Sequence, residues 1–222
     1  MHRYVERMTA IHTVLFDLDG TIIDSIDLIV DSYLHTFRSH GLPMLSREEI
    51  IHGIGTPLRT VFGAWTDDPA TMESWIATYR GYNLAHHDAR VSAFPGMVPL
   101  IRTLAERSVP LGLVTSKNRV GAVRGLELVG LGDTMQVIVG ADDVVKPKPD
   151  PEPVRRALDA LDAAPEGTAF VGDSHHDIES GRAAGVTTIG VTWGPIAREH
   201  LVRAGAHHIC DHPDEVQRLV LP

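Results

Sequence analysis

The sequence predicts an α/β fold in which a doubly wound parallel sheet carries an inserted helical segment. Short runs rich in Val, Ile and Leu recur along the 222 residues, and each leads into a longer segment of helical period. Such uninterrupted apolar runs are typical of strands that crossover helices cover on both faces of a sheet. With 43% apolar residues, the chain can form one large domain or one domain with an inserted lobe.

Five apolar runs are expected to form the buried strands of this sheet, and each is followed by Gly, Asp, Ser or Thr. They cover residues 13–16, 111–114, 137–139, 169–171 and 188–191, and a weaker run at 207–210 is expected to add an edge strand. In an open sheet of parallel strands, ligands bind at the carboxyl ends of the strands. Functional side chains are therefore expected directly after these runs.

The gap between the first two runs is far longer than one crossover helix needs, which predicts an insertion. A helix is expected over residues 24–40, where apolar residues recur on one face and Gly41 follows. Further helices are expected over 47–52, 58–65 and 70–87. A break containing Pro and Gly at 93–97 returns the chain to the sheet. We therefore place a helical lobe at residues 22–92 and a core at 1–21 and 93–222.

Two carboxylates, Asp17 and Asp19, follow the first strand directly in the segment DLDGT at 17–21. Alternation along an extended chain points both the same way, and two like charges that close are costly to keep ionised without a cation. Mg²⁺ prefers oxygen ligands, so carboxylates without His or Cys favour magnesium over zinc. The segment therefore predicts a magnesium site, with a simple acidic turn as the alternative.

Later strand ends supply other polar groups. Thr115 and Ser116 begin a helix, where hydroxyl and amide groups can bind phosphoryl oxygens, although both residue types are also ordinary helix caps. The segment KPKPDPEP at 146–153 is stiffened by its prolines around Lys146 and Lys148. A second acidic pair follows the fourth run, in GDSHHD at 172–177. Carboxylates, hydroxyls and an ammonium are thus expected at one edge of the sheet.

In these segments the sequence resembles the haloacid dehalogenase-like phosphatases, in the branch that contains phosphoglycolate phosphatases and a bacterial inorganic pyrophosphatase. The similar segments are FDLDGTIIDS at 16–25, LVTSK at 113–117, KPKPDPEP at 146–153 and GDSHHD at 172–177. They occur in the family's order and span nearly the whole chain. The resemblance implies a Rossmann-like core with a helical cap inserted after the first motif.

The resemblance also implies roles for these residues in a magnesium-dependent phosphohydrolase. Asp17 would be the nucleophile that forms an aspartyl-phosphate, and Asp19 would be the general acid and base. Thr115 would bind a phosphoryl oxygen, and Lys148 would neutralise charge on the nucleophile and the phosphate. Phosphoryl transfer depends mostly on positioning and charge stabilisation, which is what such groups supply.

The magnesium ligands implied by the resemblance are Asp173, the Asp17 carboxylate and the Asp19 backbone carbonyl. Further residues are expected to bind substrate or to support this set: Gly20, Thr21, Ser116, Lys117 and Asp177. Lys146 and Lys148 both begin a K-P-x-P-x-P pattern. The spacing from Lys148 to Gly172 fits the family better, so we choose Lys148.

The expected substrate is a small phosphomonoester such as phosphoglycolate, and inorganic pyrophosphate is the alternative. The segments GDSHHDI at 172–178 and VTWGPIAREHL at 191–201 look more like the pyrophosphatase branch. In the expected cap, a loop at 52–59 containing Gly and Pro is a candidate to face the site. Arg59 would then meet a second anionic group, whereas a plain loop before a helix is the alternative.

A phosphoacceptor switch, which would hold a lasting phosphate on Asp17, is the rival from another class of protein. Asp19 and the long insertion count against it, because a switch needs a stable aspartyl-phosphate and has no use for a lid.

Composition sets the outer limits of these expectations. A formal net charge of −9 argues against a nucleic-acid partner, and no stretch approaches the ~20 apolar residues of a membrane span. The single cysteine, Cys210, allows no internal disulfide. Since no secretory signal is recognised, we expect a cytoplasmic monomer or homodimer that acts on a small phosphorylated metabolite and has no membrane partner.

Overall fold

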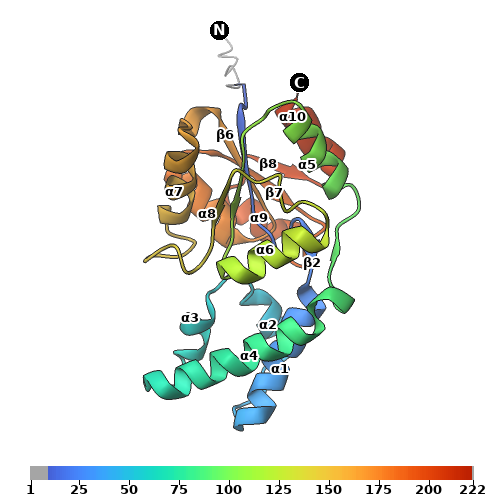
Figure 1. Ribbon diagram of the computed structural model, residues 1–222. Helices are drawn as coiled ribbons and strands as arrows, with labels where there is room; N and C mark the ends of the chain where they lie inside the picture. Colours follow the sequence, from blue (N-terminus) through green and yellow to red (C-terminus); the bar gives the residue numbers. More distant parts are fainter. Residues whose placement is uncertain (1–9, 222) are drawn as a thin grey trace.

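The computed structural model describes residues 10–221 and contains the predicted parallel sheet (Figure 1). Six strands lie in the order β5-β4-β1-β6-β7-β8, and every neighbouring pair is parallel. Their bounds are β1 (Thr13–Phe16), β4 (Leu111–Val114), β5 (Val137–Val139), β6 (Thr168–Gly172), β7 (Thr187–Val191) and β8 (His208–Cys210). The predicted α/β class is confirmed, and the strand bounds differ from the expected ones by at most one residue at an end.

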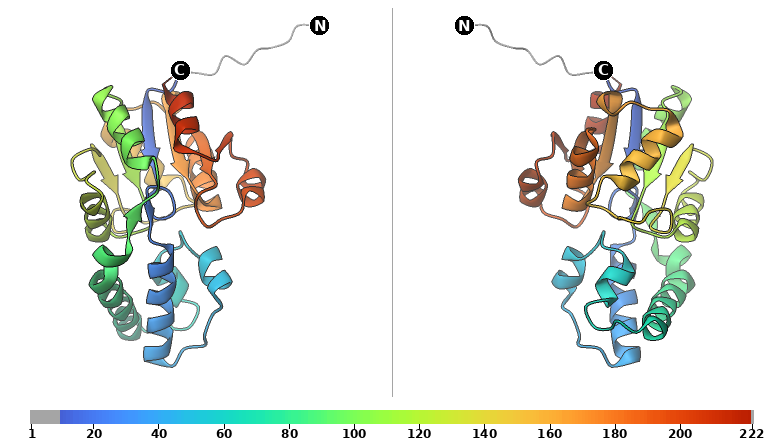
Figure 2. Two further views of the ribbon diagram at one scale, coloured as in Figure 1. Left: turned by 90° about the vertical axis from the view of Figure 1, so that its right-hand side faces the viewer. Right: turned by 90° about the vertical axis from the view of Figure 1, so that its left-hand side faces the viewer.

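Helices cover both faces of this sheet, as Figure 2 shows. Successive residues of β1 point to opposite faces, so Val14 and Phe16 pack in one hydrophobic cluster and Leu15 in another. The first cluster includes side chains of α5 (Met97–Glu106), α6 (Arg119–Leu128) and α10 (Pro213–Val220). The second includes side chains of α7 (Glu152–Leu161) and α8 (His175–Ala184). This two-sided burial explains why the strands are apolar throughout.

The inserted segment folds as helices beneath the carboxyl ends of the strands (Figure 1). These are α1 (Ile26–His40), α2 (Arg47–His52), α3 (Leu58–Phe62) and α4 (Pro69–Arg90). We call them the cap. They enclose a separate cluster in which the Phe62 ring lies 6.3 Å from that of Phe37 and 5.9 Å from that of Trp75. A short antiparallel pair, β2 (Ile23–Asp24) and β3 (Ser92–Ala93), links the cap to the sheet. The predicted division at residues 22 and 92 stays a prediction, and it falls at this pair.

Three expected helices have other bounds in the structure. The helix expected from residue 24 begins at Ile26, because Asp24 pairs with Ser92 in the link. The helix expected over 58–65 ends at Phe62, where Gly63 occupies the C-cap. The helix expected over 70–87 begins at Pro69 and continues to Arg90. Asp68 caps its start by accepting a hydrogen bond from the Thr71 backbone N–H at 2.8 Å. Within residues 10–221, no helix combines the length and the apolar character that crossing a membrane requires.

The cap cluster predicts a large loss of stability for Phe62→Ala. Phe62 is fully buried among aromatic side chains, so truncation leaves a cavity and should lower the free energy of unfolding by about 3–5 kcal/mol. Urea unfolding followed by tryptophan fluorescence measures this, since Trp65 and Trp75 belong to the cluster. Met44→Ala, at a half-exposed position, is the control and should cost less than about 0.5 kcal/mol. Equal effects of the two variants would contradict a separately packed cap.

Candidate active site

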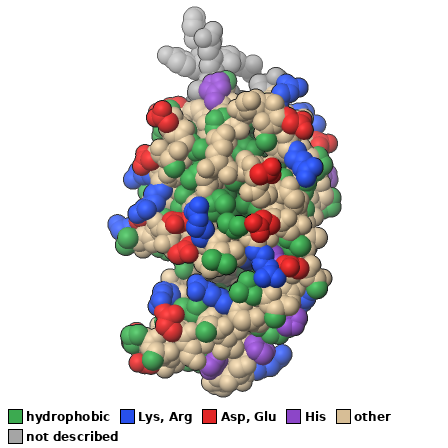
Figure 3. Space-filling view, viewed as in Figure 1, with side chains coloured by type: hydrophobic (Ala, Val, Ile, Leu, Met, Phe, Trp, Pro, Cys, Tyr) green, Lys and Arg blue, Asp and Glu red, His purple; other side chains and the backbone are tan. Residues whose placement is uncertain are grey.

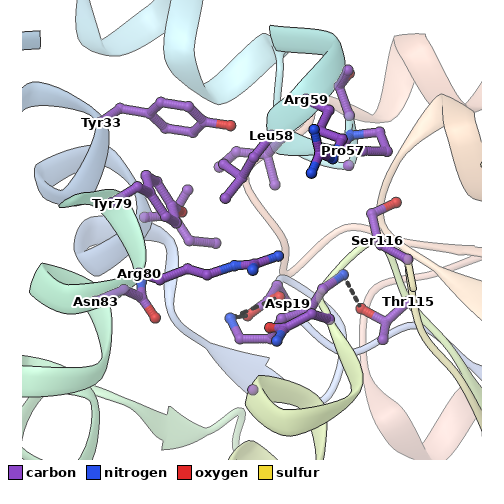
Figure 4. A pocket seen from close by; sticks show the side chains of 18 of the residues that line it. Asp19, Tyr33, Pro57, Leu58, Arg59, Tyr79, Arg80, Asn83, Thr115 and Ser116 are labelled. Carbon is purple, nitrogen blue, oxygen red and sulfur yellow. Dashed lines mark hydrogen bonds and ion pairs between the residues drawn. The ribbon is translucent and has the colours of Figure 1, made fainter. Parts of the chain in front are cut away.

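The predicted site residues meet where the sheet faces the cap. Asp17 follows β1, Thr115 follows β4 and Asp173 follows β6, and these three strands are neighbours at the centre of the sheet. Their carboxyl ends open into a cavity of about 410 Å³ that is lined by core and cap residues. Figure 3 shows the molecule hollowed between the two parts, and Figure 4 shows the cavity from close by. The parallel sheet therefore brings motifs that are distant in the sequence together in one site.

The turn after β1 is built around Asp173. Gly20 has a φ of +89°, and a Cβ at this position would lie 2.5 Å from Asp173 Oδ2, so the turn requires glycine. The neighbouring Thr21 hydroxyl donates to Asp173 Oδ1 at 3.0 Å. From the other side, Gly194 approaches so closely that a Cβ would lie 2.5 Å from Asp173 Cβ. Two chain segments, 20–21 and the one at Gly194, thus enclose this carboxylate.

Lys148 contacts two carboxylates at the base of the cavity, which we call the floor and which is formed by Asp17, Lys148, Asp173 and Asp177. Its Nζ donates to Asp17 Oδ1 at 2.8 Å and to Asp177 Oδ1 at 2.6 Å. Lys148 is only 4% exposed, whereas Lys146 is exposed and donates its backbone N–H to Glu152. The structure therefore brings Lys148, and not Lys146, beside Asp17.

Asp177 belongs to the same cluster and is held by the start of α8. The backbone N–H and the hydroxyl of Ser174 both donate to Asp177 Oδ2, at 3.0 and 2.6 Å. Carboxylate oxygens of Asp17, Asp173 and Asp177 lie within 4.8 Å of one another. All three residues are buried, so the site concentrates negative charge where water cannot screen it.

This crowding changes the protonation equilibria of the cluster. Burial raises the pKa of Asp17 to about 7, with contributions from the Asp177 and Asp19 charges, while the Lys148 ammonium acts in the opposite direction. Burial and the carboxylates of Asp177 and Asp17 also raise the pKa of Asp173 well above its usual range. Burial alone would lower the pKa of Lys148, but its two carboxylate partners outweigh burial and raise it. One ammonium is therefore too little positive charge for three carboxylates.

A divalent cation fits this set of donors. When all three buried carboxylates are ionised, a single ammonium leaves two negative charges uncompensated, and hard cations prefer carboxylate oxygens. Lys148 uses one oxygen each of Asp17 and Asp177, and Thr21 uses one oxygen of Asp173. Within residues 10–221, Oδ2 of Asp173 accepts no hydrogen bond from protein and is available as a ligand. Asp17 Oδ2 likewise accepts none, so it is open to a substrate while Asp17 Oδ1 faces the positive charges.

Asp19 is held apart from this cluster and faces the cavity. The Ser25 hydroxyl donates to its Oδ1 at 2.5 Å, and Lys117 Nζ lies 3.0 Å from Oδ1 and 3.2 Å from Oδ2. The Lys117 backbone N–H also donates to the Thr115 hydroxyl at 3.2 Å (Figure 4). Lys117 thus connects two predicted site residues. Ser116 lines the same cavity, and its buried hydroxyl has no hydrogen-bond partner within residues 10–221.

The cap contributes a wall that the motifs did not reveal. Tyr33 from α1 and Tyr79, Arg80 and Asn83 from α4 line the cavity (Figure 4). For the α4 residues the signal in the sequence is their spacing, because residues three or four positions apart share a face of a helix. Arg59 also lines the cavity, but its guanidinium forms an ion pair with Glu73, and its predicted contact with a second anionic group stays a prediction.

The cap also touches the core beside the carboxylates. His176 Nε2 lies 3.4 Å from the Thr56 hydroxyl in the loop between α2 and α3. Burial lowers the pKa of His176 to about 4, and the neighbouring His175 adds to the effect, so this ring is neutral near pH 7. A neutral imidazole at this contact lets the cap loop approach without adding charge to the site.

Known proteins are similar to this chain in sequence and in fold. The sequence model of the family described as haloacid dehalogenase-like hydrolase matches residues 14–191. The pyrophosphatase PpaX of Anoxybacillus flavithermus is 44% identical over 191 residues, which are 86% of this chain and 88% of that protein. The structure of a predicted phosphatase from Clostridium acetobutylicum has 27% identity and a TM-score of 0.84, and covers 96% of this chain and 99% of its own.

A predicted phosphoglycolate phosphatase from Haemophilus somnus is similar in fold. It has 20% identity and a TM-score of 0.84, over 96% of this chain and 99% of that one. The family match spans the motifs at 16–25, 113–117, 146–153 and 172–177, and the resemblance predicted from these motifs is confirmed. The chain belongs to the haloacid dehalogenase-like hydrolases and is a phosphohydrolase.

Proposed function

We propose that this phosphohydrolase cleaves inorganic pyrophosphate into two phosphates through an aspartyl-phosphate on Asp17. The observation that carries the mechanism is the pairing of Lys148 with only one oxygen of Asp17, at 2.8 Å, on the floor of the cavity. The other oxygen is left to attack phosphorus. The choice of pyrophosphate over phosphoglycolate is supported by the 44% identity to a pyrophosphatase.

Two displacements account for the overall reaction. In the first, Asp17 Oδ2 bonds to one phosphorus, the bond to the bridging oxygen breaks, and Asp19 gives its proton to the departing phosphate. In the second, Asp19 takes a proton from water, whose oxygen attacks the phosphorus and releases Asp17. The separate anchoring of Asp19 by Ser25 and Lys117 supports this division of work, because Asp19 must exchange protons while Asp17 exchanges a phosphoryl group.

The remaining groups stabilise charge. Lys148 would neutralise Asp17 and the transferred phosphoryl group, and Thr115 would donate to a phosphoryl oxygen. Asp17, Asp173 and Asp177 supply carboxylates that suit Mg²⁺, and the Asp19 backbone carbonyl stays a predicted fourth donor. Magnesium, when bound, supplies the positive charge that three carboxylates and a phosphate require.

A screen of phosphate release tests the substrate. We expect the wild-type protein with Mg²⁺ to release phosphate from pyrophosphate over many turnovers and with a higher kcat/KM than from phosphoglycolate. Asp17→Asn should release none, because the amide cannot form the intermediate. Preference for phosphoglycolate would overturn the substrate but leave the mechanism intact, whereas stoichiometric labelling without release would favour a phosphoacceptor switch.

Separate alanine substitutions of the two lysines test the role of Lys148. Lys148→Ala should lower kcat by about 10²–10³-fold, since it removes a charge that stabilises the transferred group. Lys146→Ala is the matched control, because this lysine is exposed, and should stay within about twofold of wild type. Far-ultraviolet circular dichroism corrects each rate for the folded fraction. A larger loss in Lys146→Ala than in Lys148→Ala would contradict the role of Lys148.

Removal of divalent cations tests the carboxylate cluster. Dialysis against EDTA should abolish turnover, and added Mg²⁺ should restore it, because the uncompensated carboxylates otherwise repel an anionic substrate. Undiminished turnover after complete chelation would exclude a metal from the mechanism.

A further inference from the structure

The two lysine side chains near the floor of the cavity are already paired with carboxylates. Lys148 contacts Asp17 and Asp177, and Lys117 contacts Asp19. Pyrophosphate brings a second phosphoryl group, which leaves and is therefore farthest from Asp17. This group needs positive charge that the floor does not offer, so the cap wall above it must supply the charge.

Two cap arginines line the cavity, and they differ in one respect. Arg59 forms an ion pair with Glu73, which offsets its charge. Arg80 forms no ion pair and donates no hydrogen bond to any residue within 10–221. Figure 4 shows its side chain extending from α4 into the cavity, toward the side where Asp19 and Thr115 lie. Arg80 is thus the arginine of this wall whose charge and donors remain free.

The position of Arg80 is fixed by its own helix. Its neighbours Ile76, Tyr79 and Asn83 are at most 8% exposed and attach this stretch of α4 to the cap. The Asn83 amide donates to the Ser32 hydroxyl of α1 at 3.1 Å, and this hydroxyl donates to the Leu28 carbonyl at 2.6 Å. The backbone that carries Arg80 is therefore packed against the rest of the cap. Only the side chain must order when a ligand binds.

We propose that Arg80 binds the leaving phosphoryl group of the substrate and makes the site selective for substrates with a second anionic group. This inference rests on the proposed phosphohydrolase mechanism. A guanidinium suits the task because its planar donors match two phosphate oxygens at once. Lys117, beside the general acid Asp19, marks the side of the cavity from which the leaving group departs.

The test compares substrates with and without that second group. Only molecules whose phosphoryl group reaches Asp17 are turned over. p-Nitrophenyl phosphate has no second phosphate or carboxylate, so its kcat/KM reports on the residues around Asp17 and not on Arg80. Arg80→Ala should lower kcat/KM for pyrophosphate by about 10–100-fold, mainly through KM, and change the aryl phosphate by less than about threefold. Arg80→Lys should recover part of the loss. Arg38→Ala, at an exposed arginine of α1 that does not line the cavity, is the matched control and should change either substrate by less than about threefold.

A binding experiment separates this inference from the proposed substrate. In the Asp17→Asn background, calorimetric titration with pyrophosphate should give a Kd about 10–100-fold weaker when Arg80→Ala is added. If the wild type cleaves only phosphoglycolate, the proposed substrate is wrong. A loss of kcat/KM in Arg80→Ala that is confined to phosphoglycolate, whose carboxylate is a second anionic group, would still support the role of Arg80. Equal losses for all substrates, or unchanged binding and KM, would overturn the role of Arg80. The melting temperature should not move, since Arg80 is exposed and unpaired.

Discussion

Repulsion among three buried carboxylates is the constraint on which this structure depends. Asp17, Asp173 and Asp177 lie within 4.8 Å of one another, and Lys148 alone joins two of them. Such a cluster forms only if the rest of the fold compels it. Parallel strands bring the acids to one edge, Gly20 makes room for the Asp173 carboxylate, and the start of α8 holds Asp177. The energy stored in this repulsion becomes affinity for a cation and for a phosphoryl group that neutralise it.

The cap supplies the side of the cavity that lies opposite the carboxylates. The floor can hold one phosphoryl group but cannot distinguish what is attached to it. The wall formed by Tyr33, Tyr79 and Arg80 lies opposite the floor and is carried by helices with their own hydrophobic cluster. Because the cap is linked by a two-stranded ribbon, its wall can differ among relatives without disturbing the carboxylates. We therefore propose that the sheet carries the transfer chemistry and that the cap carries substrate recognition.

Much of the fold followed from the sequence, because strands buried on both faces have few alternatives to continuous Val, Ile and Leu. The candidate site was predictable wherever a motif follows a strand, as at Asp17, Thr115 and Asp173. Proline spacing alone did not separate Lys146 from Lys148, since burial decides between them and depends on distant packing. Arg80 was missed because its helix carries no motif and its place above the cavity depends on how the cap docks. The ion pair that occupies Arg59 was equally invisible, as it joins two helices.

We propose that the carboxylate cluster makes Asp17 a nucleophile. Rapid acid quenching of an Asp19→Asn variant mixed with pyrophosphate and Mg²⁺, followed by peptide mass spectrometry, tests it most directly. Asn at position 19 removes the acid of the first displacement and the base of the second, but phosphate departs without a proton more readily than water attacks without a base, so the intermediate should accumulate. We expect one phosphoryl group on Asp17 and none in the Asp17→Asn, Asp19→Asn double variant. Phosphate release by the wild type, with no phosphorylated carboxylate detected at any quench time in either protein, would contradict it.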